Sequence, residues 1–308
     1  MEDQVIDRRA LPHDAQLGEW LAPDGWRYRR LEWPGDGRGS LLFAGGRGDF
    51  IEKYLEAQHH WHDAGWTVTA FDWRSQGGSR GDIVGGHLES MDPLVDDLAA
   101  LIEDWKARHP APHVVIAHSM GGHVLARTLA ERRPQIDAAV LVAPMMLVNS
   151  EPLPPWAAWW TASLFTLAGF GRVPIWRSPT ASEGAGARRR SYLTSSPERF
   201  EDELWWWERQ PGYKLGPPSW GWLLAAMRSC AVLTPKALGG ITTPCLFLAT
   251  ERDRLVSASA IRRAAEVIPA AELLMLNDSG HEILREADPV RLRALNAIDA
   301  FFARHAAR

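Results

Sequence analysis

Five short apolar runs, separated by amphipathic stretches, constrain the fold of this chain more than any other feature. The runs occupy residues 41–44, 68–71, 114–117, 139–142 and 246–249. They are nearly continuous in apolar residues, which is typical of strands that are buried on both faces of a sheet. Segment 91–108 has apolar residues at three- and four-residue spacing, which predicts a helix. We therefore expect an α/β protein with a mostly parallel, doubly wound sheet, whose ligands bind at the carboxyl ends of the strands.

The interval of residues 147–240 breaks this alternation with proline clusters and with nine of the sixteen tryptophans of the chain. We therefore expect a helical insertion at 147–240 and a core domain built from residues 1–146 and 241–308. Such an insertion leaves and re-enters the sheet at the strand ends where ligands bind. Four side chains in it share one helical face: Trp156, Trp159, Trp160 and Leu164. An indole-rich face suits an acyl-chain pocket or a membrane interface, and simple core packing is the alternative.

The segment of residues 113–122 reads HVVIAHSMGG, in which a buried-strand run ends at a serine and a helical pattern follows. A nucleophile elbow needs a serine on a sharp strand-to-helix turn, flanked by small residues. Ala117 stands in place of the first glycine of the G-x-S-x-G pattern, and an ordinary turn serine is the alternative interpretation. We predict that Ser119 is a nucleophile and that the Met120 N–H contributes to an oxyanion hole.

A serine hydroxyl needs a base, and the base needs a group that orients it. His281 follows the run at residues 271–276, and Asp253 follows the run at 246–249. Glu251 is the other carboxylate in that loop, and we choose Asp253. The chain order serine, aspartate, histidine, each after a predicted strand, is the order of the α/β-hydrolases.

A glycine-rich loop, FAGGRGDFIEKY, follows the first buried run. We expect the Arg47 N–H to be the second oxyanion donor, and we expect Gly46 to lie beside the substrate. Such a loop could also bind phosphate. However, the sequence has neither the G-x-x-x-x-G-K-[ST] nor the G-x-G-x-x-G pattern, and nucleotide binding is disfavoured.

The chain resembles the bacterial lysophospholipases of the monoacylglycerol-lipase-like group within the α/β-hydrolases. The resemblance spans nearly the whole chain and rests on GRGDFIEKY at 46–54, FDWRSQGGS at 71–79, AHSMGG at 117–122, SPERF at 196–200, WGW at 220–222 and GHEILRE at 280–286. It implies a triad of Ser119, Asp253 and His281, with Arg47 and Met120 as oxyanion donors. It also implies that the insertion is a cap. Gly45 departs from the family, because many relatives have a histidine there.

These observations predict a serine ester hydrolase that cleaves a monoacyl lipid, a lysophospholipid or monoacylglycerol, through an acyl-enzyme. The alternatives are a general carboxylesterase or thioesterase for bulky apolar esters, or a catalytically silent α/β-hydrolase that binds a ligand. We expect the cap to contact the substrate through four tryptophans: Trp156, Trp159, Trp160 and Trp206. The head group, the acyl length and the oligomeric state stay open.

The net charge of −4 and the pI near 6.3 disfavour nucleic acid as a partner. We expect no cofactor and no metal, since the two cysteines form no C-x-x-C pair and the cluster of His59, His62 and Asp63 has no matching ligands elsewhere. The arginines at 188–190 could meet a phosphate or an anionic lipid, but a solvated loop is favoured. Neither a secretory signal nor a membrane span is evident. We expect a cytoplasmic protein, with peripheral contact at the inner membrane face as an extension of the cap hypothesis.

Overall fold

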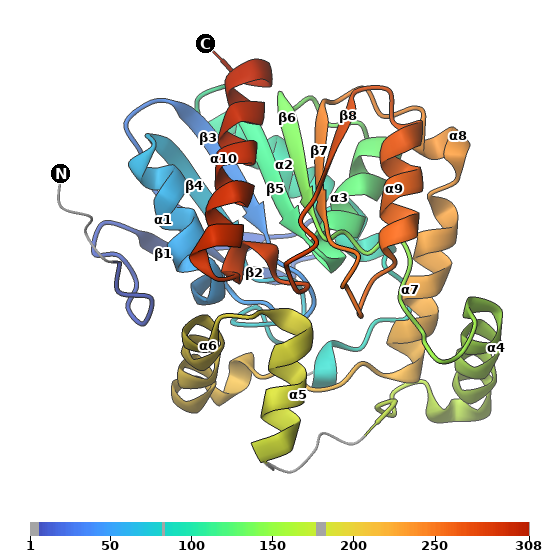
Figure 1. The fold of residues 1–308 in the computed structure, drawn as a ribbon. Coiled ribbons are helices and arrows are strands. Elements are labelled where there is room, and N and C mark those ends of the chain that lie inside the picture. The colour runs from blue at the N-terminus through green and yellow to red at the C-terminus, as the bar shows by residue number, and fades with distance from the viewer. Residues whose placement is uncertain (1–5, 82–83, 177–182, 308) are drawn as a thin grey trace.

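The computed structural model describes residues 6–81, 84–176 and 183–307. Its centre is an eight-stranded sheet with the order β1-β2-β4-β3-β5-β6-β7-β8 (Figure 1). The strands are β1 Gln16–Leu21, β2 Arg27–Trp33, β3 Gly39–Ala44, β4 Trp66–Phe71, β5 His113–His118, β6 Ala138–Val142, β7 Cys245–Ala249 and β8 Ala271–Met275. All five predicted strands are confirmed, and each is one or two residues longer than the apolar run that predicted it.

The sheet is antiparallel at one edge and parallel elsewhere. Strands β1 and β2 form an antiparallel hairpin, and β2 also runs antiparallel to β4. The remaining pairs, from β4–β3 to β7–β8, are parallel. Ala44 pairs with both Phe71 and Ala117, so the carboxyl ends of three central strands lie level with one another. The predicted mostly parallel, doubly wound α/β-hydrolase fold is confirmed.

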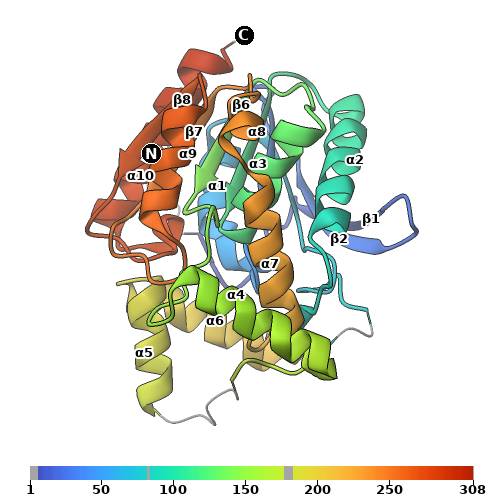
Figure 2. The same cartoon turned by 90° about the vertical axis from the view of Figure 1, so that its right-hand side faces the viewer.

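Helices cover both faces of the sheet (Figures 1 and 2). Helices α1 Leu55–Asp63 and α10 Asp288–His305 pack on one face, and α2 Asp92–Arg108, α3 Met120–Glu131 and α9 Ala258–Val267 pack on the other. Strand β5 is apolar throughout because both of its faces are buried: Val114 and Ile116 pack in the core on the α1 and α10 side of the sheet. Val115 and Ala117 pack in the core on the α2 and α3 side. Each face therefore needs its own apolar partners, and the predicted helix at 91–108 is confirmed as α2.

The segment between β6 and β7 contains the remaining longer helices and gathers at one end of the sheet (Figure 1). It comprises α4 Pro155–Phe165, η3 Thr166–Phe170, α5 Glu183–Leu193, α6 Pro197–Arg209, η4 Pro211–Tyr213, α7 Trp220–Val232 and α8 Pro235–Leu238. Helix α4 lies across α7 (Figure 2). Trp222, Ala226 and Cys230 of α7 pack into the core cluster of α2 and α3, so α7 connects this segment to the sheet domain.

Three short helices complete the described chain: η1 Ile51–Tyr54, η2 Val84–Gly86 and η5 Ile283–Arg285. Helix η1 follows the glycine-rich loop after β3, and η5 follows His281. Both therefore begin within a few residues of the predicted site. Among the helices of the described residues, none combines the length and the hydropathy that a membrane span requires.

Candidate active site

Ser119 lies at a sharp turn between β5 and α3. Its backbone has φ 53° and ψ −114°, in a region that L residues rarely adopt, and its N–H donates to Val142 O at 2.9 Å. The turn is possible because its neighbours are small. A Cβ at Gly121 would lie 2.3 Å from Gly45 O, and one at Gly122 would lie 2.8 Å from Pro144 Cβ. Ala117 is completely buried in β5, so an alanine is accommodated where the usual pattern has glycine.

The structure brings Ser119, His281 and Asp253 together from three separate loops. His281 Nε2 lies 2.8 Å from Ser119 Oγ, and His281 Nδ1 lies 2.6 Å from Asp253 Oδ2. The other carboxylate oxygen of Asp253 accepts the N–H groups of Leu255 and Val256 at 2.8 and 3.0 Å. Both oxygens of this carboxylate are therefore held, and the imidazole is aligned between it and the serine.

Glu251, the alternative carboxylate, does not approach His281. It is exposed and forms an ion pair with Arg262 at the protein surface. The geometry therefore favours Asp253 as the residue that orients the imidazole.

The buried charges around His281 alter its protonation. Burial alone would lower the pKa of His281, but the adjacent Asp253 carboxylate, with Glu282 and Asp49 further away, raises the pKa above its ordinary value. Burial alone would raise the pKa of Asp253, but His281 and two backbone N–H groups lower it. An ionised Asp253 next to an imidazole of raised basicity is the electrostatic arrangement that proton transfer from a serine requires.

The glycine-rich loop lies directly against Ser119. A Cβ at Gly46 would be 2.9 Å from Ser119 Cβ, so only glycine fits there. The N–H groups of Gly46 and Gly48 donate to the side chains of Asp49 and Gln76, each at 2.6 Å. The amides of Arg47 and Met120 donate to no protein acceptor in the parts of the chain that the structure describes. These two amides are the donors that the sequence predicts for an oxyanion hole.

Comparison with known proteins identifies the family. The family model for serine aminopeptidase, S33, matches residues 35–288. The chain belongs to the serine aminopeptidase S33 family of α/β-hydrolases. The family resemblance expected from the sequence is thereby confirmed.

Two curated relatives of this S33-family protein carry the name lysophospholipase L2. The protein of Escherichia coli K12 is 30% identical over 290 residues, which cover 86% of this chain and 80% of that protein. The protein of Haemophilus influenzae, named as a probable lysophospholipase L2, is 27% identical over 284 residues, which cover 89% of this chain and 87% of that protein. A Saccharomyces cerevisiae monoglyceride lipase, solved as a soluble variant with a substrate analogue, has the same fold. It superposes with a TM-score of 0.77 at 16% identity, covering 98% of this chain and 100% of that one.

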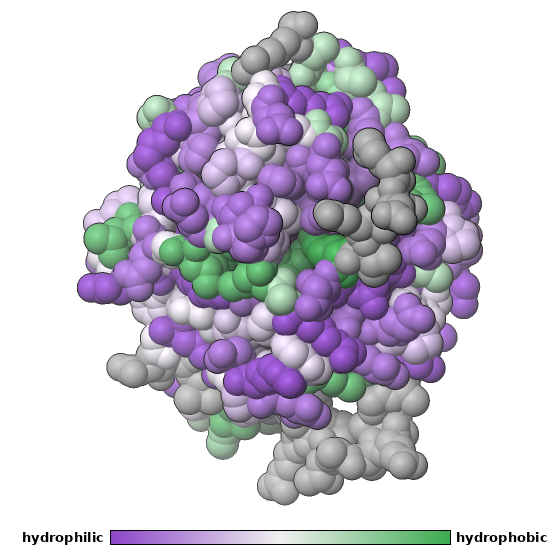
Figure 3. Space-filling model, turned by 90° about the vertical axis from the view of Figure 1, so that its left-hand side faces the viewer, coloured by the Kyte–Doolittle hydropathy of each residue, from purple (hydrophilic) through white to green (hydrophobic). Residues whose placement is uncertain are grey.

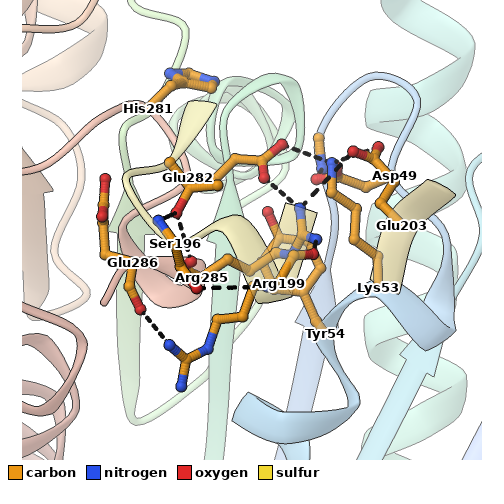
Figure 4. A network of polar contacts seen from close by, with 12 residues as sticks. Asp49, Lys53, Tyr54, Ser196, Arg199, Glu203, His281, Glu282, Arg285 and Glu286 are labelled. Carbon is orange, nitrogen blue, oxygen red and sulfur yellow. Dashed lines mark hydrogen bonds and ion pairs between the residues drawn. The ribbon is translucent and has the colours of Figure 1, made fainter. Parts of the chain in front are cut away.

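Sequence reasoning missed a buried network of charges beside the triad (Figure 4). At its centre is Lys53 of η1, whose Nζ lies 2.7 Å from Asp49, 2.6 Å from Glu282 and 3.2 Å from Glu203. Glu282 also pairs with Arg285. All five side chains are buried. The four-residue spacing of Asp49 and Lys53 and the three-residue spacing of Glu282 and Arg285 are the local signals of this network in the sequence.

The network joins loops at the edge of the sheet to the segment between β6 and β7. Glu203 lies on α6 and also binds Arg189 of α5 at 2.8 and 3.0 Å. Burial alone would raise the pKa of Glu203, but Lys53 and Arg189 lower it to about 2. Helix α6 is thus linked by charge to Lys53 of η1, and α5 is linked to α6 through Arg189.

His118, which directly precedes Ser119, belongs to the same network. Its Nδ1 lies 2.8 Å from Asp49 Oδ2 and 3.0 Å from the Tyr54 hydroxyl, and its Nε2 lies 3.4 Å from His281 O. The rings of His118 and His281 are 4.9 Å apart between centroids. His118 therefore lies between the network and His281, and it makes no hydrogen bond to Ser119 Oγ among the described residues.

The four tryptophans predicted to contact substrate do not lie together. Trp206 of α6 packs with Phe50 and Leu55, and its Nε1 donates to Arg8 O at 3.1 Å. On α4, Trp156 and Trp160 are 69% and 68% exposed. Trp159 is half-buried and lies 5.9 Å from the Arg228 guanidinium. The indole-rich face of α4 is thus an outer surface in this structure, and Trp206 belongs to a separate interface.

The remaining charged clusters have partners of their own. His59 pairs with Asp63, whereas His60 pairs with Asp299 on α10. Within the described ranges, no group of three or more histidine, cysteine, aspartate or glutamate side chains is arranged to hold a metal ion. Among the arginines at 188–190, Arg189 is paired with Glu203 as described above. Arg189 is therefore not free to bind a lipid phosphate.

Proposed function

We propose that this S33-family enzyme hydrolyses the carboxylic ester of a monoacyl lipid, either a lysophospholipid or a monoacylglycerol. The observation that carries the proposal is the continuous hydrogen-bonded chain from Asp253 through His281 to Ser119, at distances of 2.6 and 2.8 Å. The names of the relatives, lysophospholipase L2 and monoglyceride lipase, support this substrate class.

The first half of the reaction acylates the serine. Ser119 Oγ attacks the ester carbonyl carbon while His281 Nε2 accepts the hydroxyl proton. The carbonyl oxygen becomes an oxyanion, which accepts hydrogen bonds from the N–H groups of Arg47 and Met120. The ester C–O bond then breaks, and His281 returns the proton to the departing glycerol oxygen. The acyl group stays on Ser119, and the head-group alcohol leaves.

The second half releases the fatty acid. A water molecule in the place of the alcohol gives its proton to His281 and attacks the acyl carbonyl. The same two amides stabilise the second oxyanion, and the Ser119 ester bond breaks with return of the proton to Oγ. No other co-reactant is needed for either half, so we propose that the enzyme uses neither cofactor nor metal.

We further propose that residues 147–240 are the cap and that residues 1–146 with 241–308 are the core domain. Support comes from α4, where Trp156, Trp160 and Leu164 recur at four-residue spacing and are all about two-thirds exposed. Large aromatic and aliphatic side chains on one face of a helix are suited to the boundary between lipid head groups and acyl chains. The cap would therefore deliver lipid to the site from a peripheral position, at the inner membrane face of a cytoplasmic enzyme.

A general carboxylesterase or thioesterase for bulky apolar esters is the second candidate, because the same triad cleaves those bonds. A hydrolysis panel separates the two: oleoyl glycerol, oleoyl lysophospholipids, an oleoyl thioester and short aryl esters. The proposal predicts that the two lipids have the highest kcat/KM. Aryl acetates or the thioester as the best substrates would contradict it.

A silent ligand-binding member of the fold is the third candidate. A fluorophosphonate probe reacts only with an activated serine, so it should label the wild type and not Ser119→Ala. Folded wild-type protein that resists the probe would favour the silent alternative.

A further inference from the structure

The turn that carries Arg47 is closed by one residue, Asp49. The Asp49 N–H donates to Gly46 O at 3.3 Å, and Asp49 Oδ2 accepts the Gly46 N–H at 2.6 Å. Asp49 therefore holds both main-chain groups of the residue before Arg47. Gly48, on the other side, is held by Gln76. With its neighbours fixed in this way, the Arg47 amide is the one N–H of the turn from Gly46 to Asp49 that is left without an acceptor among the described residues.

The Asp49 carboxylate is itself fixed from two sides. Oδ1 accepts from Lys53 Nζ at 2.7 Å, and Oδ2 lies 2.8 Å from His118 Nδ1. Burial alone would raise the pKa of Asp49, but Lys53 and His118 lower it well below the ordinary range. The carboxylate thus stays ionised, and a charged acceptor forms a stronger hydrogen bond with the Gly46 N–H than a neutral one would.

The departure at Gly45 has a physical explanation in the same contact. A Cβ at Gly45 would lie 2.8 Å from Asp49 Cβ, closer than two such carbons approach. The space that a side chain at residue 45 would need is therefore occupied by Asp49. Gly45 and Asp49 therefore depend on each other. Gly45 leaves the space that Asp49 fills, and the Asp49 carboxylate accepts the hydrogen bond that orders the loop.

We propose that Asp49 is a positioning residue for ester hydrolysis, which acts by holding the Gly46–Arg47 peptide so that the Arg47 N–H faces the developing oxyanion. The inference rests on the proposed function, because an oxyanion forms only if Ser119 attacks an ester. Asp49 is buried, and among the described residues it makes no hydrogen bond to Ser119 Oγ. Its effect is carried by Gly46, whose Cα region lies against the Ser119 side chain.

The test compares two double variants that carry the same charge. Asp49→Ala with Lys53→Met and Asp49→Asn with Lys53→Met each remove one negative and one positive charge from the network. The asparagine variant keeps an oxygen that can accept the Gly46 N–H, whereas the alanine variant does not. Any difference between them therefore reports that hydrogen bond rather than the charge balance.

We expect the alanine double variant to have a kcat about 10²-fold lower than that of the asparagine double variant, as for loss of one oxyanion donor. KM should be similar in the two variants, because the substrate makes no contact with Asp49. The melting temperatures check that both variants are folded. Equal kcat values in two folded proteins would overturn the proposal and leave Asp49 as a charge partner of Lys53.

A second readout does not depend on turnover. In Ser119→Ala protein, the Gly46 amide should give a downfield proton resonance that exchanges slowly, since it donates to a buried carboxylate. The signal should remain protected in the asparagine double variant and become fast-exchanging in the alanine one. If the wild type hydrolyses no ester, the proposed function fails, while this measurement still decides whether Asp49 orders the loop. Fast exchange of the Gly46 amide in both the Ser119→Ala protein and the asparagine double variant would contradict that ordering.

Discussion

The two sides of the proposed active site are built from opposite kinds of chemistry. On the core side, Lys53 and Glu282 are buried, and each has an oppositely charged partner within 2.7 Å. On the cap side, α4 exposes Trp156 and Trp160 with no partner for either indole among the described residues. The face of the molecule away from α4 is mainly hydrophilic and is crossed by a band of hydrophobic residues (Figure 3).

This difference predicts which side tolerates substitutions. A buried charged side chain is stable only while its partner is present. Removal of one charged residue on the core side should therefore displace the residues that pair with it. An exposed apolar face makes few contacts that depend on direction, and its loss costs the fold little. Substitutions on the core side should therefore impair every ester alike, whereas substitutions on α4 should change only the preference among esters.

The largest effect should come from the nucleophile and its base. Ser119→Ala and His281→Ala should each lower kcat by roughly 10⁶-fold for short and long esters alike, and the double variant should lose no more than either single variant. The reason is that the serine is reactive only with its base in place. Initial rates with an aryl acetate and an oleoyl ester measure this. Losses that multiplied in the double variant would mean that the two residues act independently.

Asp253→Asn should lower kcat by about 10⁴-fold, because an amide supports the wrong imidazole tautomer. Glu251→Gln is the matched control: it lies in the same loop and changes a carboxylate to an amide, but its partner is the surface residue Arg262. It should keep near-normal turnover. A result in which Glu251→Gln is inactive and Asp253→Asn is active would reverse the assignment.

Lys53→Met should destabilise the protein by about 3–5 kcal/mol, because it removes the buried cation that pairs with Asp49, Glu203 and Glu282. These three carboxylates would then share only Arg189 and Arg285 as cationic partners within the network. Lys106→Met is the matched control, since Lys106 pairs with Glu103 at the surface and should change the free energy of unfolding by about 0.5 kcal/mol or less. Urea unfolding of both variants gives the comparison. Equal stability of the two would show that the core side is not held by its charges.

Much of this structure could be predicted from local sequence. The buried network of charges could not. The strands follow from short apolar runs, and Ser119, Asp253 and His281 are each found because they directly follow such a run. Lys53, Glu203 and Glu282 are far apart in the chain, and a charged residue in an amphipathic stretch usually indicates a solvated surface. Their burial depends on how α5 and α6 pack against η1 and the loop after β8, which no local pattern reports.

The tryptophans illustrate the same limit. Trp160 and Trp206 both lie in indole-rich helices of the insertion, and composition treats them alike. One is exposed and the other is buried against Phe50, because α6 docks on η1 and α4 does not. Periodicity identifies the face of a helix, but it does not say whether that face meets protein or solvent.

A smaller effect concerns pH. The neutral form of His281 is the base, so kcat/KM should fall about tenfold per unit as the pH drops below the pKa of His281. Because Asp253 raises that pKa, the midpoint should lie above about 6.5, the ordinary value for histidine. Asp253→Asn removes the negative charge and should move the midpoint to lower pH. A midpoint below 6.5 in the wild type, or an upward shift in the variant, would contradict this account of the core side.

The smallest effect on the fold, and the most selective effect on substrate, should come from Trp160. Each methylene that a lipid buries contributes about 0.8 kcal/mol, so kcat/KM should rise from acetyl to long-chain esters while the cap side offers apolar surface. Trp160→Ala should flatten this rise, leave acetyl-ester turnover unchanged and alter the free energy of unfolding by no more than about 0.5 kcal/mol. Trp206→Ala is the contrasting control, because it empties a buried site and should cost about 3–5 kcal/mol. An acyl-length series on both variants, with urea unfolding, separates the two roles. If acetyl esters were the best substrates of the wild type, or if Trp160→Ala changed stability and not the series, α4 would be a structural helix and the cap side would have no part in lipid selection.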